Sequence, residues 1–237
     1  MRDEFLTRTA ALLGSEATDR LAASSVFIAG LGGVGGYVLE GLARSGVGEF
    51  WLCDSDSVAE SNLNRQIIAT VDTVGRRKTD VAAERVLSIN PDAKIHKLDL
   101  FLTPENVPSL LRDASPDYVA DAIDTVSAKL ALAVTAAELG IPIISSMGTG
   151  NKLDPTRLCI ADISKTHTCP LARVMRRELR LRGISHLDVL FSDEPPITTV
   201  CEGSEGGRHV PASAIFVPAS AGLTIASHIV LRLIERK

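Results

Sequence analysis

The chain has 237 residues, of which 45% are hydrophobic, 23% charged and 4% aromatic, so it can bury a sizeable core. This composition excludes intrinsic disorder, a collagen-like repeat and a disulfide-rich miniprotein, and the length predicts one globular domain. The formal net charge of -4 argues against a protein that binds nucleic acid through its overall charge. Binding of nucleic acid would then require a local basic patch. No Cys-x-x-Cys pair occurs, so neither a zinc site nor a thioredoxin-type redox site is predicted from Cys53, Cys159, Cys169 and Cys201.

Apolar, β-branched runs alternate with helical patterns from the first predicted strand onward. Upstream of it, residues 1–9 are charged and contain no apolar run of signal-peptide length, which argues against secretion. The predicted strands are Val26–Ala29, Phe50–Cys53, Lys94–Leu98, Tyr118–Ala122 and Pro142–Ser145. This alternation predicts a Rossmann-like, doubly wound and mostly parallel α/β sheet with helices on both faces.

The remainder of the chain extends the same domain, which we take to span 1–237. Arg157–Asp162 is predicted as a strand and Pro170–Arg182 as a helix. The glycine-rich stretch Glu202–Arg208 is predicted to be a mobile loop, in which Cys201 would be reactive if exposed. We assign 165–210 as an insertion on the substrate side with this mobile loop.

An uncharged stretch of 23 residues, His209–Leu231, is long enough to cross a bilayer. Pro218 and Gly222 interrupt it, and several hydroxyl side chains lie within it. We therefore predict a C-terminal extension made of a strand, Ser213–Val217, and a core helix, Ser220–Arg236, with no membrane span and a cytoplasmic location.

A glycine-rich loop directly follows the first strand, with the sequence Gly30-Leu31-Gly32-Gly33-Val34-Gly35. These glycines suit a tight turn, close backbone approach to a phosphate and close helix packing, and the helix that follows offers free N–H groups to an anion. Asp54 ends the second strand, where a carboxylate can reach a ribose hydroxyl. The pattern predicts that an adenine nucleotide binds here, but it does not distinguish NAD(H), FAD, S-adenosylmethionine and ATP. The alternative is a glycine-rich turn that binds no ligand.

Cations beyond the second strand favour a triphosphate over a dinucleotide. The segment Asn62–Gln66 contains Arg65, and Lys78 follows shortly after it. The β and γ phosphates of ATP project beyond the helix dipole and need Arg, Lys and Mg²⁺ to meet their charge. Asp124 follows the fourth strand at its carboxyl end, a natural position for a Mg²⁺ ligand.

These segments resemble the ThiF/MoeB/HesA superfamily of ATP-dependent adenylating enzymes, which share the fold of ubiquitin-activating enzymes. The matching motifs are GLGGVG at 30–35, DSDSVAESNLNRQI at 54–67, GRRK at 75–78 and DAID at 121–124, and the resemblance covers about residues 1–165. It implies ATP and Mg²⁺ as cofactors, with Asp124 as the metal ligand. The nucleotide-binding residues that it implies are Gly30, Gly32, Gly33, Gly35, Asp54, Asn62, Arg65, Gln66 and Lys78.

The resemblance extends to the N-terminus, where Phe5-Leu6-Thr7-Arg8 is similar to the start of the family's N-terminal helix. In that family an arginine of this helix reaches the γ phosphate across a dimer interface. The resemblance therefore implies a homodimer with shared sites, and Arg8 joins Arg65, Lys78 and Asp124 as a candidate catalytic residue.

Motifs further along the chain resemble the tRNA threonylcarbamoyladenosine dehydratase subfamily over nearly the full length. They are TPEN at 103–106, DPT at 154–156, DISKT at 162–166, PLARVMRRELR at 170–180 and FSDE at 191–194. The subfamily uses ATP to activate the threonyl carboxylate of threonylcarbamoyladenosine beside the anticodon, and loss of water closes a cyclic form. The implied partners are tRNA and a second copy of the chain, with a sulfur acceptor protein linked to a cysteine desulfurase as a further candidate.

The sequence also allows function classes other than the dehydratase. One is a MoeB/ThiF-like enzyme that adenylates the C-terminus of a small ubiquitin-like sulfur carrier, although such enzymes usually carry two Cys-x-x-Cys pairs. Others are a nicotinamide oxidoreductase and a nucleotide sensor without catalysis. Phe101, Trp51 and Tyr118 are predicted to pack in the core and not to stack on bases.

The predicted helix Pro170–Arg182 carries a basic stripe, a row of arginines that helical spacing places on one face. Arg173, Arg176, Arg177 and Arg180 fall at positions i, i+3, i+4 and i+7, which places four guanidinium groups on one face. On a chain of net negative charge this stripe predicts a surface that contacts RNA phosphates, with a solvated helix face as the alternative.

Overall fold

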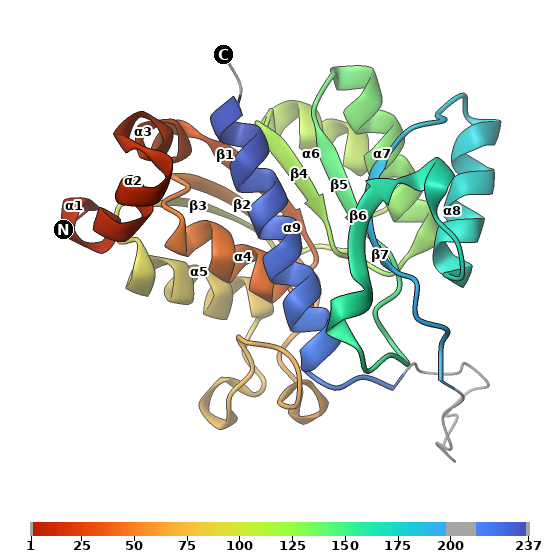
Figure 1. Ribbon diagram of the computed structural model, residues 1–237. Coiled ribbons are helices and arrows are strands. Elements are labelled where there is room, and N and C mark those ends of the chain that lie inside the picture. Colours follow the sequence, from red (N-terminus) through yellow and green to blue (C-terminus); the bar gives the residue numbers. More distant parts are fainter. Residues whose placement is uncertain (1, 198–211, 236–237) are drawn as a thin grey trace.

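The computed structural model describes residues 2–197 and 212–235 of the chain (Figure 1). Its centre is a seven-stranded sheet in the order β3-β2-β1-β4-β5-β7-β6, in which every pairing is parallel except that of β6 with β7. The strands are β1 (Ser25–Ala29), β2 (Glu49–Cys53), β3 (Lys94–Leu98), β4 (Tyr118–Asp121), β5 (Ile143–Ser146), β6 (Leu158–Asp162) and β7 (Asp188–Ser192). The strand order reverses between β1 and β4, and ligands of such sheets bind at the carboxyl ends of the strands at this point.

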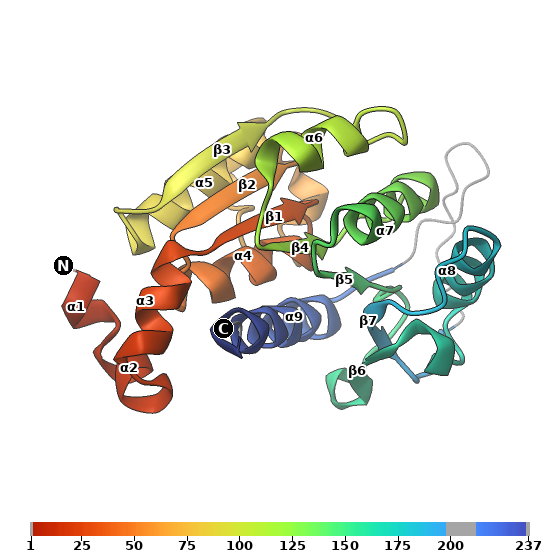
Figure 2. The same cartoon turned by 90° about the horizontal axis from the view of Figure 1, so that it is seen from above.

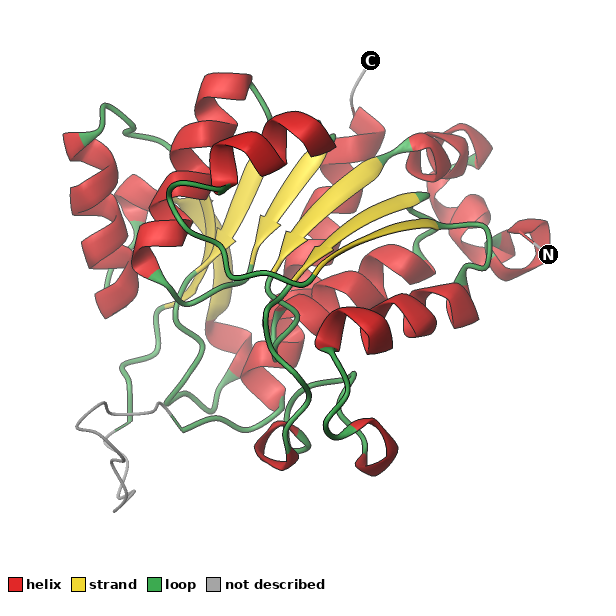
Figure 3. Cartoon of the chain, turned by 180° about the vertical axis from the view of Figure 1, so that it is seen from behind, coloured by secondary structure: helices red, strands yellow, loops and turns green. Residues whose placement is uncertain are grey.

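Helices cover both faces of the sheet (Figure 2). They are α1 (Arg2–Phe5), α2 (Thr7–Leu13), α3 (Ser15–Ala23), α4 (Gly35–Arg44), α5 (Lys78–Ile89), α6 (Val107–Ala114), α7 (Val126–Leu139), α8 (Pro170–Leu181) and α9 (Phe216–Glu235). Helices α4, α5 and α9 lie on one face, while α6 and α7 lie on the other, where Figure 3 shows them in front of the strands. The α/β class and the doubly wound sheet are therefore confirmed.

Strand β1 shows why the central runs are apolar without interruption. Val26 and Ile28 belong to the core cluster that α4, α5 and α9 complete, whereas Phe27 and Ala29 belong to the cluster that α6 and α7 complete. Successive side chains of a strand point to opposite faces, so a strand buried on both faces needs an apolar residue at every position.

Strand β7 was not predicted, although it completes the sheet between β5 and β6. Its residues Val189, Leu190 and Phe191 are buried, and their short apolar run is the signal that could have revealed it. The segment 165–210 thus contributes α8 and β7 to the described structure. The predicted mobile loop Glu202–Arg208 and Cys201 lie outside the described residues.

The predicted strand Ser213–Val217 is wrong, because helix α9 already begins at Phe216. A strand needs a neighbouring strand for its backbone, but the backbone of 212–213 bonds to two single residues. Ala212 donates its N–H to Asn151 Oδ1 and accepts from the Asn151 N–H at its carbonyl, and the Asn64 amide donates to the Ser213 carbonyl. Pro218 lies in the first turn of α9, where its missing N–H costs no helical hydrogen bond.

Helix α9 is the described helix that is long and apolar enough to cross a membrane, by length and composition alone. Half of its most apolar window is buried against the rest of the chain, with Ala221, Ile225 and Ile229 in the core cluster of α4. A Cβ on Gly222 would meet the Val34 carbonyl oxygen and Tyr37, so the two helices cross in close contact. Helix α9 therefore packs as a core helix, as predicted for Ser220–Arg236, and begins four residues earlier than predicted.

Candidate functional site

A cavity of about 660 Å³ lies at the carboxyl ends of β1, β2 and β4, where the strand order reverses. It collects residues from segments that are far apart in sequence, including the loop after β5 and the start of α9. The predicted residues that line it are Gly30, Gly32, Gly33, Asp54, Asn62, Arg65, Gln66, Lys78 and Asp124. Of the predicted nucleotide-binding and catalytic residues, all but Gly35 and Arg8 thus line this cavity.

The glycines of the loop 30–35 have different roles. Gly30 has a φ of +87° and faces the Ala122 carbonyl, and a Cβ on Gly35 would overlap the Gly30 carbonyl oxygen. These two glycines therefore shape the turn between β1 and α4. A Cβ on Gly32 would meet only the Gln66 amide, at 3.8 Å, so this backbone is open to a ligand at the N-terminus of α4.

Asp54 directly follows β2, and its buried side chain holds the glycine loop in place. Its Oδ2 accepts a hydrogen bond of 2.7 Å from the Leu31 N–H, and its Oδ1 accepts one of 2.9 Å from the Asp56 N–H. A carboxylate oxygen has a second lone pair, so the predicted bond to a ribose hydroxyl is compatible with these contacts. The contact with Leu31 is a structural role that the sequence did not reveal.

Two cations line the cavity. Lys78 is the first residue of α5, and its Nζ lies 2.8 Å from Asp56 Oδ2 and 3.7 Å from Asp54 Oδ1. Arg65 donates to the Ser61 carbonyl at 2.8 Å and to Asn64 Oδ1 at 2.9 Å. Both positive charges are thus held in place by neighbouring oxygen atoms.

Asp124 offers carboxylate oxygens to a bound molecule, and Gln66 carries an unpaired amide oxygen. Gln66 is buried, and its Oε1 has no hydrogen-bond partner among the described residues. Asp124 is exposed in the turn after β4. The described residues contain no group of three or more His, Cys, Asp or Glu that could hold a metal. This arrangement fits Mg²⁺, which usually binds one or two carboxylates together with phosphates and water.

Phe101 also lines the cavity, with 57% of its surface exposed, so the prediction that it packs in the core is wrong. It follows β3, and the rule that ligands bind beyond the carboxyl ends of strands could have placed it here. Tyr118 is buried as predicted. Trp51 is partly buried and stacks on His96 of the neighbouring strand at 3.8 Å between ring centres.

Cys53 is a cavity residue that sequence patterns did not assign to the site. Burial, together with the charges of Asp54 and Asp99, raises the pKa of its thiol to about 12. A thiol with that pKa is protonated at neutral pH and does not act as a nucleophile.

Arg8 lies in α2, at the opposite end of the sheet from the cavity (Figure 1). The neighbouring Leu6 packs against Gly46, just beyond the C-terminus of α4, whereas the glycine loop is at its N-terminus. Within one chain, therefore, Arg8 does not reach the nucleotide cavity, and its contribution from a second copy stays a prediction.

The four arginines of α8 do not form a uniform stripe. Arg173, Arg177 and Arg180 are exposed, and Arg177 pairs with Glu178 at 2.8 Å. Arg176 is half-buried and donates to the Thr166 carbonyl at 2.8 Å and to Thr166 Oγ1 at 2.6 Å. It joins α8 to the segment before it, which leaves three arginines facing solvent.

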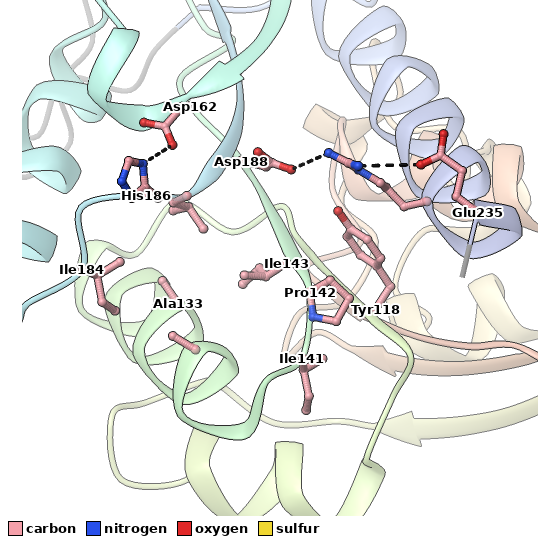
Figure 4. Close-up of a pocket in the computed structure, with 13 residues that line it drawn as sticks. Tyr118, Ala133, Ile141, Pro142, Ile143, Asp162, Ile184, His186, Asp188 and Glu235 are labelled. Atoms are coloured by element: carbon pink, nitrogen blue, oxygen red, sulfur yellow. Dashed lines mark hydrogen bonds and ion pairs between the residues drawn. The ribbon is translucent and has the colours of Figure 1, made fainter. Parts of the chain in front are cut away.

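A second cavity, of about 520 Å³, lies at the amino ends of β4, β5 and β7 (Figure 4). Most of the residues that line it are apolar, and its polar side chains contact one another. His186 lies 3.0 Å from Asp162, and Arg232 lies 3.8 Å from Asp188. None of the predicted site residues lines it.

Comparisons with known proteins show the family of this chain. The ThiF family model matches residues 6–230. The tRNA threonylcarbamoyladenosine dehydratase of Bacillus subtilis is 42% identical, over 97% of this chain and 94% of its own length. A crystal structure of the Escherichia coli tRNA N6-threonylcarbamoyladenosine dehydratase in complex with ATP superposes with a TM-score of 0.89 at 34% identity, covering 98% of this chain and 95% of the other.

A sulfur carrier protein adenylyltransferase of Thermus thermophilus is 36% identical, but the match covers only 56% of this chain and 48% of that protein. The match to the dehydratases extends over nearly the whole chain, including the part that carries α8, β7 and α9. The chain therefore belongs to the ThiF family and, within it, to the tRNA threonylcarbamoyladenosine dehydratases.

Proposed function

We propose that the protein uses ATP to dehydrate threonylcarbamoyladenosine beside the tRNA anticodon, by activating the threonyl carboxylate so that it closes into a cyclic form. The observation that carries this proposal is the cavity at the strand reversal, which gathers the glycine loop, Asp54, Arg65, Lys78 and Asp124. It is supported by the match to dehydratases along nearly the whole chain.

ATP binds in this cavity with its phosphates at the N-terminus of α4. Asp54 is positioned for the ribose, while Arg65 and Lys78 lie where they can meet the phosphate charge. Lys78 gives up part of its contact with Asp56 in favour of the nucleotide. Mg²⁺, when bound, neutralises phosphate charge, and Asp124 is the side chain that would hold it.

Activation is necessary because a carboxylate is a poor acyl donor, since its leaving group would be oxide. The carboxylate oxygen bonds to a phosphorus of ATP and displaces the phosphates beyond the broken P–O bond. The carbamoyl group then attacks the acyl carbon and expels the oxygen together with its phosphate group, while the protein contributes position and charge neutralisation. The carbamoyl group that attacks belongs to the same nucleoside, so no covalent enzyme intermediate is needed. The high pKa of Cys53, the cysteine in the cavity, supports this route.

The exposed arginines Arg173, Arg177 and Arg180 contact the tRNA backbone, because phosphate contacts orient an RNA substrate without reading its sequence. A homodimer supplies Arg8 to the site of the partner, and the protein works in the cytoplasm. A sulfur acceptor linked to a cysteine desulfurase is a further candidate partner, although 210–217 contains no cysteine to relay sulfur.

The decisive test is to incubate the protein with ATP, Mg²⁺ and tRNA that carries threonylcarbamoyladenosine, and to digest the product to nucleosides. Mass spectrometry should show the loss of one water from the modified nucleoside, and only with ATP present. An unchanged nucleoside, together with pyrophosphate exchange on a peptide that ends in Gly-Gly, would instead support adenylation of a sulfur carrier.

A further inference from the structure

A fully buried ion pair lies directly beneath the nucleotide cavity. Lys129 of α7 places its Nζ 2.9 Å from Oδ2 of Asp121, the last residue of β4, and both side chains have no exposed surface. Ser145 of β5 donates a hydrogen bond of 2.5 Å to the same Asp121 oxygen. Burying two charges costs more than their attraction returns unless further hydrogen bonds complete the arrangement.

The further hydrogen bonds of this pair go to backbone that leads into the cavity. Lys129 Nζ donates to the Ile123 carbonyl at 3.1 Å and to the Ser146 carbonyl at 2.8 Å, while Asp121 Oδ1 accepts from the Ile123 N–H at 3.3 Å. Both backbone polar groups of Ile123 are therefore fixed by the pair. The next residue is Asp124, and Ile123, Asp124 and Thr125 all line the cavity.

A pair of apolar side chains of similar volume would fill this space with no loss of stability in many proteins. Such a pair could not hold the Ile123 peptide groups, because it offers neither a donor nor an acceptor. We propose that Lys129 and Asp121 are positioning residues, which fix the turn after β4 so that Asp124 faces the bound nucleotide. This inference rests on the proposed function, in which Asp124 acts on ATP.

The test removes both charges together, so that neither is left buried without a partner. In the double variant Asp121→Asn, Lys129→Met, the new amide oxygen can still accept from Ser145, and the new thioether chain fills the space of the lysine stem. We expect ATP affinity in EDTA to stay within about twofold of wild type, since the glycine loop is untouched. The increase in ATP affinity on adding Mg²⁺ should shrink, and kcat should fall about tenfold or more with little change in KM for tRNA.

A mutant cycle separates positioning from a general structural role. In a background of Asp124→Asn, removing the pair should lower the residual activity by less than about threefold, because the side chain that the pair positions is already altered. The matched control is Glu40→Gln, Arg85→Met, which removes a buried carboxylate of α4 and its arginine partner on α5, leaves the exposed second partner Arg44, and lies away from the cavity lining. This control should lower the melting temperature and leave kcat unchanged.

An equal loss of activity in both backgrounds, or a pair variant with wild-type kcat and Mg²⁺ response, would overturn the inference. If Asp124→Asn is itself fully active, the proposed role of Asp124 fails and the inference fails with it, whereas an inactive Asp124→Asn beside a fully active pair variant refutes the inference alone. Ser145→Ala, which keeps both charges and removes one hydrogen bond to Asp121, should show the same pattern to a smaller degree. If the double variant does not fold, Ser145→Ala alone tests whether the pair of Lys129 and Asp121 positions Asp124.

Discussion

At the scale of single residues, Asp124 contributes little to the fold, and its role in the chemistry is the one we propose above. It is exposed in the turn after β4, and its carboxylate lines the nucleotide cavity. Asp121, three positions earlier, is buried and paired with Lys129. Two acidic residues of one short motif thus have different surroundings, because Asp124 follows the strand and Asp121 still belongs to the sheet.

Replacing Asp124 with Ala should lower kcat by about 100-fold or more, the typical cost of losing one group that stabilises charge in the transition state. The melting temperature should move by no more than a few degrees, since an exposed side chain contributes little to stability. Rate measurements with calorimetry on the same preparations check both expectations. Wild-type turnover would remove Asp124 from the site.

Replacing Cys53 with Ala should leave kcat within about twofold of wild type, because a thiol with a pKa of about 12 is protonated at neutral pH and takes no part in catalysis. Alkylation at pH 8 should modify the exposed Cys159 well before Cys53, as peptide mapping can show. A large loss of activity in Cys53→Ala, with ATP affinity unchanged, would point to a covalent intermediate.

At the scale of elements, helix α8 combines a buried face with three solvent-facing arginines. Ala172, Met175 and Leu179 are buried, and the Arg176 guanidinium donates hydrogen bonds to Thr166. Helical spacing predicted the common face of the four arginines, but it could not show which of them another segment would bind. The RNA surface to test is therefore Arg173, Arg177 and Arg180.

Replacing Arg177 and Arg180 with Gln should weaken tRNA binding for all tRNA sequences and flatten its salt dependence by roughly one unit of log slope per lost contact. ATP affinity should not change. An unchanged salt slope for the double variant would show that α8 is only a solvated face.

In contrast, Arg176→Gln should lower the free energy of unfolding by about 1–3 kcal/mol, because it leaves buried acceptors at Thr166 without a partner.

The contact of α9 with β4 and β7 should make stability depend on pH. Burial lowers the pKa of His228, and Arg232 lowers it further, while Asp188 at 3.3 Å and Glu235 act in the opposite direction. The unfolded chain then binds the proton more readily, so stability present above the ordinary histidine pKa of about 6.5 is lost as the pH falls below it. Denaturation of His228→Gln between pH 5 and 8 should show a smaller loss than wild type.

At the scale of the whole molecule, the nucleotide cavity and the N-terminal helices lie at opposite ends of the sheet. Arg8 can therefore serve the reaction only from a second copy. Mixing inactive Arg8→Ala protein with inactive Lys78→Ala protein should restore about a quarter of wild-type activity at equal amounts, since half the dimers are hybrids with one intact site. With subunit exchange confirmed by mass spectrometry, a lack of rescue would exclude the shared site.

The sequence by itself determined the features that depend on neighbouring residues. The glycine loop, Asp54 after β2 and Asp124 after β4 were placed correctly, because a parallel sheet brings the carboxyl ends of its strands to one edge. Their common cavity therefore followed once five strands had been recognised. The apolar run of β1 indicated burial on both faces for the same reason.

Only the tertiary structure decided the features that depend on a distant partner. The stretch 213–217 has the side chains of a strand, but Asn64 and Asn151 hold the backbone of 212–213, and α9 begins at Phe216 against α4. Arg176 and Lys129 carry charges that local patterns place at the surface, yet Thr166 accepts from one and Asp121 pairs with the other. A local pattern describes what a side chain prefers, whereas the partner it meets depends on how segments far apart in the chain pack together.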